Sequence, residues 1–147
     1  AGQIVTWRYP PPYDLYNIAE EQAASAARAM LDPAQRYTAI RGGPGGQLVA
    51  FCCLGADARV PGGNYSRECL DVGVGLRPDL TGAGMGSALI PAVLDHCATA
   101  PEQLPLRVTV AEFNARALRV WGRAGFVRVE RFVRPRDQRP FLVLVRD

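Results

Sequence analysis

Apolar and polar positions follow two kinds of pattern along the second half of the chain. Short apolar runs typical of strands occupy Leu70–Leu76, Leu106–Val110, Val127–Val133 and Pro140–Val145. Between them, apolar side chains at helical spacing predict helices over Gly84–Ala98 and Asn114–Ala124. Strands that alternate with helices predict an α/β domain in which helices pack on a mixed sheet.

The first half contains shorter elements separated by proline and glycine. The pattern predicts a strand over Ile4–Tyr9, broken by three prolines, and an Ala-rich helix over Ile18–Leu31 that ends before Pro33. A five-residue glycine-rich turn then joins two further strand candidates in a hairpin. These two strands are predicted over Tyr37–Arg41 and Gln47–Leu54.

Size and composition limit the possible classes of protein. With 147 residues, 48% of them hydrophobic, the chain forms one core and is expected to be a single domain over residues 1–147. The net charge of +3 is mild for a nucleic-acid binder and fits a small anionic ligand better. No apolar run approaches the roughly 18 residues of a membrane span, and no signal peptide is evident, so we expect a cytoplasmic protein.

The four cysteines do not predict a metal site. Cys52 and Cys53 are adjacent in an apolar run, no C-x-x-C pair occurs, and His96–Cys97 is the only neighbouring His/Cys pair. We therefore expect buried, reduced thiols and no bound metal.

The candidate chemistry begins on the strand Leu70–Leu76. Side chains alternate along a strand, so Asp71, Gly73 and Gly75 share a face with little side-chain volume. Glycines within a strand mark either close approach by a ligand or a bulge or tight packing against another element. Both alternatives stay open at this point.

Three further glycines, Gly82, Gly84 and Gly86, open the helix that follows this strand. Unpaired N–H groups and the positive end of the helix dipole can bind phosphate there. The spacing matches neither G-x-G-x-x-G nor a P-loop, because no G-K-S/T follows.

Two segments resemble the GCN5-related N-acetyltransferase (GNAT) superfamily. Residues 81–86, T-G-A-G-M-G, are similar to its phosphate loop Q/R-x-x-G-x-G/A except at the first position. Residues 114–126, N-A-R-A-L-R-V-W-G-R-A-G-F, are similar to its helix N-x-x-A-x-x-x-Y/W-x-x-x-G-F. The resemblance implies a mixed, mostly antiparallel sheet of about six or seven strands with a V-shaped splay between two central parallel strands, flanked by about four helices.

The resemblance also implies a role for each matching position. Acetyl-CoA would be the co-substrate, with the pantetheine arm on the backbone of Val74, Gly75 and Leu76 and beside Asn114, and with an oxyanion donor near Val74. Arg116 is a candidate for the 3′-phosphate, against the alternative that Arg116, Arg119 and Arg123 form a solvated helix face. The pyrophosphate would lie on a loop made of Thr81, Gly82, Ala83, Gly84, Met85 and Gly86.

Two departures from the family pattern concern proton transfer and phosphate binding. Thr81 replaces a long Gln or Arg donor, and Trp121 stands where many relatives carry a Tyr that protonates the leaving thiolate. Asp71 is the preferred general base, with Glu68 and Glu112 as alternatives, although Asp71 could instead be a strand carboxylate paired with an Arg.

Aromatic residues flank the proline run near the amino terminus. Trp7, Tyr13, Asp14 and Tyr16 form either an acceptor-side wall or aromatic core packing. We expect a small-molecule or peptide amine as partner, neither nucleic acid nor membrane, and a possible homodimer. The competing hypotheses are an acyl-CoA-binding module that has lost turnover and a purely structural domain.

Overall fold

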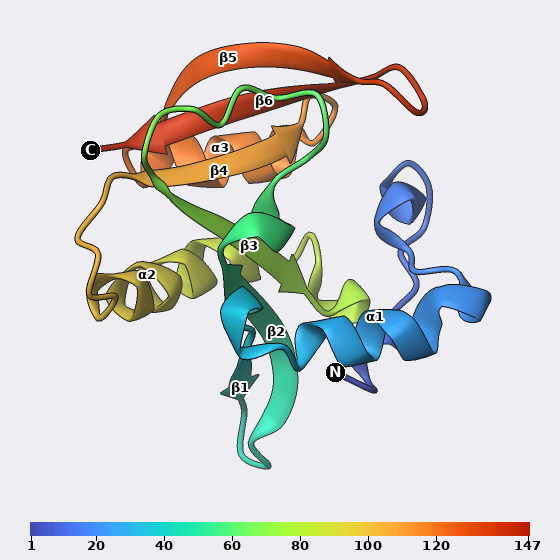
Figure 1. Cartoon of the computed structure of the whole chain (residues 1–147). Helices are drawn as coiled ribbons and strands as arrows, with labels where there is room; N and C mark the ends of the chain where they lie inside the picture. The colour runs from blue at the N-terminus through green and yellow to red at the C-terminus, as the bar shows by residue number, and fades with distance from the viewer.

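A computed structural model describes residues 1–147 and contains one six-stranded mixed sheet (Figure 1). The strand order is β1-β2-β3-β4-β6-β5, and every neighbouring pair is antiparallel except β3 and β4. The strands are β1 (Thr38–Gly42), β2 (Gln47–Leu54), β3 (Leu70–Leu76), β4 (Leu106–Ala111), β5 (Val127–Arg134) and β6 (Arg139–Arg146). The mixed sheet predicted from the alternation is confirmed.

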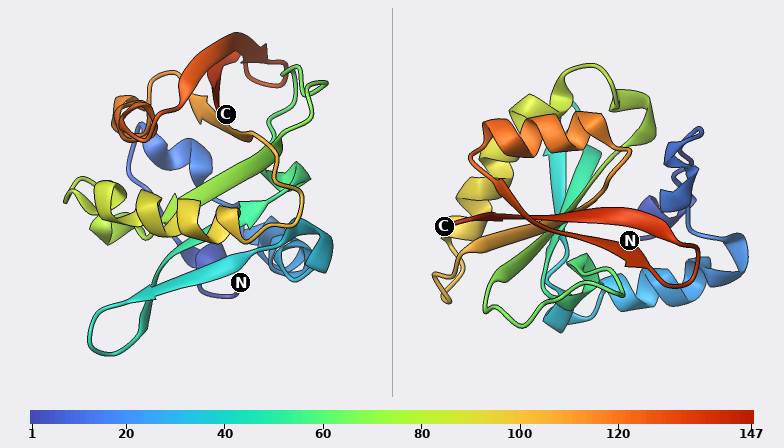
Figure 2. Two further views of the ribbon diagram at one scale, coloured as in Figure 1. Left: turned by 90° about the vertical axis from the view of Figure 1, so that its left-hand side faces the viewer. Right: turned by 90° about the horizontal axis from the view of Figure 1, so that it is seen from above.

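Three α-helices cover the two faces of this sheet (Figure 2). α2 (Met85–Ala98) and α3 (Ala115–Arg123) lie on one face, while α1 (Ala23–Met30) lies on the other with the loop that joins β2 to β3. Six short 3-10 turns complete the chain, so the expected four helices correspond to three α-helices. None of the helices has the length and apolar character needed to cross a membrane.

The main core lies between the sheet and the α2/α3 layer. Val93 of α2 is fully buried against even-numbered side chains of β3 such as Val72. These side chains point to one face because residues alternate along a strand. All four cysteines are buried free thiols, as expected.

The parallel strands β3 and β4 separate soon after they meet. Their register contains two pairs, Leu70 with Leu106 and Asp71 with Arg107. Beyond these pairs β3 continues alongside β2 while β4 continues alongside β6, and the two diverge (Figure 1). The predicted V-shaped splay is therefore present, with its vertex at Asp71 and Arg107.

The amino-terminal predictions are wrong in two places. Ile4–Tyr9 is not a strand, because Ile4–Thr6 forms a 3-10 turn in which Ile4 and Val5 are both buried. A strand would bury only one of two successive side chains. The helix predicted over Ile18–Leu31 begins as a 3-10 turn at Glu20 and becomes α-helical only at Ala23, without a side-chain cap.

Candidate active site

A cavity of about 550 Å³ occupies the open side of the V. Its walls come from β3 and β4, from the glycine-rich turn before α2, from α3, and from the amino-terminal segment that packs across the sheet. Segments far apart in the sequence thus enclose one space, and most of the predicted cofactor residues lie on its walls.

The edges of β3 and β4 that face this cavity carry backbone groups without a strand partner. Gly55 N–H donates to the Asp71 carbonyl and Arg77 N–H donates to the Val49 carbonyl, so odd-numbered residues of β3 bond to β2. Val74 and Leu76 therefore direct their N–H and C=O groups toward β4, which has already diverged. The predicted contact through Gly75 is not available, because its backbone groups face β2.

Two tyrosine hydroxyls from the amino-terminal segment reach these open edges. Tyr9 donates to the Leu76 carbonyl at 2.7 Å, and Tyr16 accepts a hydrogen bond from Asn114 Nδ2 at 3.3 Å. Their rings are 6.2 Å apart, edge to face. Burial raises the pKa of Tyr9 to about 12, and burial also raises the pKa of Tyr16, partly offset by hydrogen bonds from Asn114 and the Ala111 backbone. Both phenols are protonated at neutral pH.

The glycine-rich turn presents five free donors. The backbone N–H groups of residues 82–86 have no acceptor within the protein. Gly82 and Gly84 have φ of +79° and +77°, a conformation that glycine adopts without steric cost, and Gly84 is the N-cap of α2. Free N–H groups at a helix N-terminus are the kind of donors that can bind an anion.

Arg116 of α3 extends over this turn. One guanidinium nitrogen, Nη1, lies 2.9 Å from the position that a Cβ on Gly82 would take, and the guanidinium covers the ring of Tyr13 at 4.2 Å. Arg116, Arg119 and Arg123 all line the cavity, and none has a carboxylate within ion-pair distance. The arginine side of the cavity therefore has positive charge without a counter-ion.

Two predicted ligand side chains already have partners. The Thr81 hydroxyl donates to the Pro78 carbonyl at 2.7 Å, which closes the turn before the glycines. Asn114 Oδ1 accepts from the Ala117 N–H and so caps α3, while its Nδ2 group bonds Tyr16. With these hydrogen bonds in place, both side chains are part of the cavity wall.

Trp121 is a wall residue with one polar atom open to the cavity. It is 6% exposed and packs edge to face on Phe126, with ring centroids 4.9 Å apart. Its indole N–H has no hydrogen-bond partner, yet no buried side-chain nitrogen or oxygen lacks one. The indole nitrogen is therefore accessible from the cavity that Trp121 lines.

The glycine face of β3 is filled rather than open. A Cβ on Gly75 would lie 2.2 Å from the Phe51 ring, and a Cβ on Gly73 would lie 2.7 Å from Cys53 Sγ. These glycines admit side chains of β2, so tight packing against another element is the correct alternative. The cavity meets β3 mainly along its edge.

Asp71 lies at the vertex of the V and outside the cavity lining. Its carboxylate accepts hydrogen bonds from Arg107 Nε and Nη2 at 2.6 and 2.8 Å and from Arg59 Nε at 2.7 Å. Asp71 and Arg107 are each 2% exposed. Asp71 is therefore a strand carboxylate paired with arginine, which is the second of the two interpretations given above. This geometry does not support the predicted role as general base. Of the other acids weighed, Glu112 is paired with Arg131.

Ten of the thirteen predicted site residues line the cavity, while Ala83 and Met85 contribute only backbone N–H groups to the turn. Sequence reasoning missed Tyr9 and the partner of Asp71. Arg107 did carry a signal, because a charged residue within an apolar strand calls for a buried counter-ion. The ten lining residues are Val74, Gly75, Leu76, Thr81, Gly82, Gly84, Gly86, Asn114, Arg116 and Trp121.

The profile of the Acetyltransferase (GNAT) family matches residues 2–126 of this chain, which include the whole cavity wall. The chain belongs to the GNAT family. The GNAT resemblance of the two motifs is therefore confirmed over most of the chain. No curated protein sequence matches it.

Solved structures with the same fold include other acetyltransferases. A GNAT-family acetyltransferase from Bordetella pertussis, described as putative, aligns with a TM-score of 0.72 and 18% identity over 99% of this chain and 87% of that one. Mutant forms of a spermidine/spermine N-acetyltransferase from Vibrio cholerae align with a TM-score of 0.67 and 16% identity over 99% and 85%. At these identities the likeness shows the fold.

Proposed function

We propose that this GNAT-family protein transfers an acetyl group from acetyl-CoA to a primary amine by direct attack in a ternary complex. The observation that carries the proposal is the convergence, in one cavity, of five free N–H groups, an unpaired Arg116 and two open strand edges. A diphosphate joined to an amide-containing arm is complementary to all three features.

Different groups of the chain bind different parts of acetyl-CoA in this proposal. The N–H groups of residues 82–86 hold the pyrophosphate, with Arg116 beside them for a further phosphate. The Val74 N–H and C=O and the Leu76 N–H bond the pantetheine amides in the manner of an added strand. Catalysis is then mainly placement of the amine beside the thioester.

We propose Tyr16 as the proton donor to the departing thiolate, in place of the missing tyrosine at Trp121. Its oxygen accepts from Asn114, so its own proton is free to be donated, and its raised pKa keeps that proton in place at neutral pH. Asp71 has a structural role in this proposal, because its ion pair with Arg107 holds β3 and β4 together at their last paired residues.

Acetyl-CoA affinity and thiol release, measured on the same preparation, test the proposal. Binding by calorimetry together with amine-dependent thiol release supports it. Binding without transfer to any amine of a broad panel supports the alternative of an acyl-CoA-binding module, and absence of binding supports a structural domain. A peptide amine and a small-molecule amine belong in the same panel, and size-exclusion chromatography tests the predicted homodimer.

A further inference from the structure

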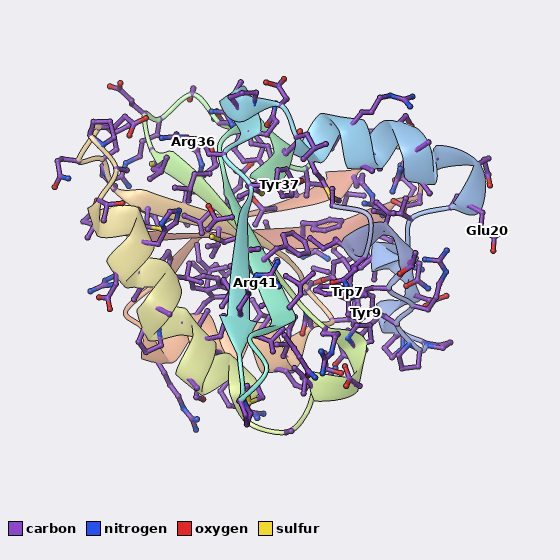
Figure 3. All side chains as sticks on the ribbon, turned by 90° about the horizontal axis from the view of Figure 1, so that it is seen from below. Trp7, Tyr9, Glu20, Arg36, Tyr37 and Arg41 are labelled. Atoms are coloured by element: carbon purple, nitrogen blue, oxygen red, sulfur yellow. The ribbon has the colours of Figure 1, made fainter.

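The half of the cavity away from the phosphate turn has an apolar wall. It is built from the amino-terminal segment, α1 and β2, on the sheet face opposite α2 and α3. Figure 3 shows Trp7 and Tyr9 beside the sheet, while Glu20 lies at the outer edge of the molecule and points away from it. The apolar wall residues are Ile4, Trp7, Ile18, Met30 and Phe51.

The charge of the cavity does not suit a polycation. Its ionic lining consists of Arg116, Arg119 and Arg123. No carboxylate is part of the lining, and Asp14 lies outside it although its neighbours Tyr13 and Tyr16 line the cavity. Asp71 is held by two arginines, and Asp57 accepts from the Tyr37 hydroxyl. A second ammonium group bound here would lose its hydration without gaining a carboxylate partner.

The aromatic rings of this wall do not form an open cage for a cation. Phe51 lies between Trp7 and Tyr37, with centroids 5.9 and 5.8 Å away, and Tyr9 packs on Tyr16. Cation–π recognition needs a free ring face within about 6 Å of the cation. Phe51 and Tyr9 already contact other rings, and the remaining wall residues Ile4, Ile18 and Met30 are aliphatic, which matches a hydrocarbon body.

We infer that the acceptor is a monoamine carried on an aromatic or arylalkyl body, which reacts as the neutral amine and is preferred over polyamines. This inference rests on the proposed acetyl transfer and names the acceptor class of the same cavity. It separates the chain from the spermidine N-acetyltransferases among its structural neighbours, whose sequences are 16–18% identical.

The protonation state follows from the lining groups. An alkyl ammonium with a pKa near 10.4 must lose a proton before attack, and the cavity lining includes two phenols with raised pKa values and no carboxylate. The neutral nitrogen forms the C–N bond, the C–S bond breaks, and the thiolate takes a proton from Tyr16. The amine proton passes to water, and Tyr16 regains a proton from water, so the enzyme returns to its starting state. An aromatic amine, neutral at pH 7, needs no prior deprotonation.

Steady-state thiol release with 2-phenylethylamine, aniline, putrescine and spermidine tests the inference. We expect kcat/KM for the two aromatic acceptors to exceed that for spermidine by about tenfold or more at pH 8. Spermidine would have to place a second, charged ammonium group in the cavity without a carboxylate partner. With 2-phenylethylamine, kcat/KM should rise about tenfold per pH unit between pH 7 and 9, since the neutral fraction does. With aniline it should stay constant.

A matched pair of variants tests whether the apolar wall determines the preference for aromatic amines over spermidine. Met30→Glu adds a carboxylate to the cavity, whereas Leu31→Glu adds the same charge one residue away on a side chain that is 72% exposed. Met30→Glu should reverse the preference toward spermidine by about tenfold relative to the parent, and Leu31→Glu should leave it unchanged. Circular dichroism and acetyl-CoA affinity confirm that both variants fold.

The outcomes separate this inference from the proposed function. Spermidine preferred by the parent, with acetyl-CoA bound and acetyl transferred, overturns the acceptor class and leaves acetyl transfer standing. A flat pH profile with 2-phenylethylamine would reveal a base in the cavity and overturn the neutral-amine step. No acetyl-CoA binding at all overturns the proposed function itself.

Discussion

The two ends of the splay between β3 and β4 are built on opposite principles. At the vertex, Asp71 and Arg107 form a buried ion pair, with Arg59 on the same carboxylate and the ring of Tyr65 near both guanidinium groups. At the open end, the backbone groups of Val74 and the N–H of Leu76 have no partner within the sheet. The same two strands are saturated with polar contacts at one end and left unsatisfied at the other.

This difference shows how a sheet can hold a gap open. Neighbouring strands gain hydrogen bonds by closing together, so a persistent opening requires a fixed hinge and side chains that fill the space beyond it. Asp71 and Arg107 supply the hinge, while Phe51 and Tyr9 occupy space around the outer part of β3. Changes at the vertex, at the glycine-rich turn and in the cavity wall should therefore have effects of decreasing size.

Asp71→Asn should have the largest effect, on stability. It leaves the Arg107 guanidinium buried without a counter-charge, which we expect to lower the free energy of unfolding by about 3–5 kcal/mol. Urea denaturation measures the loss. Asp79→Asn, which breaks an exposed pair with Arg77, is the control and should cause no measurable change. A stable Asp71→Asn protein whose rate recovers at high pH would instead restore Asp71 as the base.

Gly84→Val should weaken acetyl-CoA binding by about a hundredfold, equivalent to two lost hydrogen bonds to a charged group. The side chain would occupy the anion site, and φ at this position is +77°. Gly43→Val is a matched control, because Gly43 has a φ of +74° in the β1–β2 turn and open space around it, as Gly84 has. Calorimetric affinity that falls equally in both variants would point to backbone strain instead of ligand contact.

Tyr16→Phe should lower kcat by about tenfold, the small effect expected for a thiol that is already a tolerable leaving group. The KM for acetyl-CoA should not change, since only a hydroxyl is lost and the aromatic ring remains in the cavity wall. In the parent, kcat with a neutral amine should stay constant across neutral pH and decline only above the usual titration range of a tyrosine, because burial raises the Tyr16 pKa. Steady-state rates with aniline record both effects, and an unchanged kcat in Tyr16→Phe would assign the proton to solvent.

Trp121→Phe should have the smallest effect, less than about tenfold in kcat/KM, because the aromatic wall remains and a single N–H donor is lost. The indole nitrogen has no partner within the protein, so the folded state loses no hydrogen bond. Rates and melting temperature for the parent and the variant decide this. A loss of several hundredfold with the fold intact would mean that the indole N–H bonds the thiolate or the oxyanion.

Local patterns were sufficient to predict most elements of the second half of the chain. β3 was predicted to the residue, and α2, α3, β4, β5 and β6 each within one residue at either end. The amino-terminal segment was predicted poorly, because its conformation depends on what Ile4, Val5 and Tyr9 contact across the sheet. Its prolines and short apolar runs are equally compatible with a strand.

The sequence by itself determined the turn of free N–H groups before α2, because the glycines at positions 82, 84 and 86 and the start of a helix are local features whose N–H groups cannot pair within the first turn. Only the tertiary structure decided which groups Asp71 and the glycines Gly73 and Gly75 contact. Whether a strand carboxylate meets a substrate or an arginine, and whether a glycine receives a ligand or a phenyl ring, depends on Arg107 and Phe51 on neighbouring strands. Strand alternation specifies the face on which a side chain lies, but the partner it meets there is set by packing between strands distant in the chain.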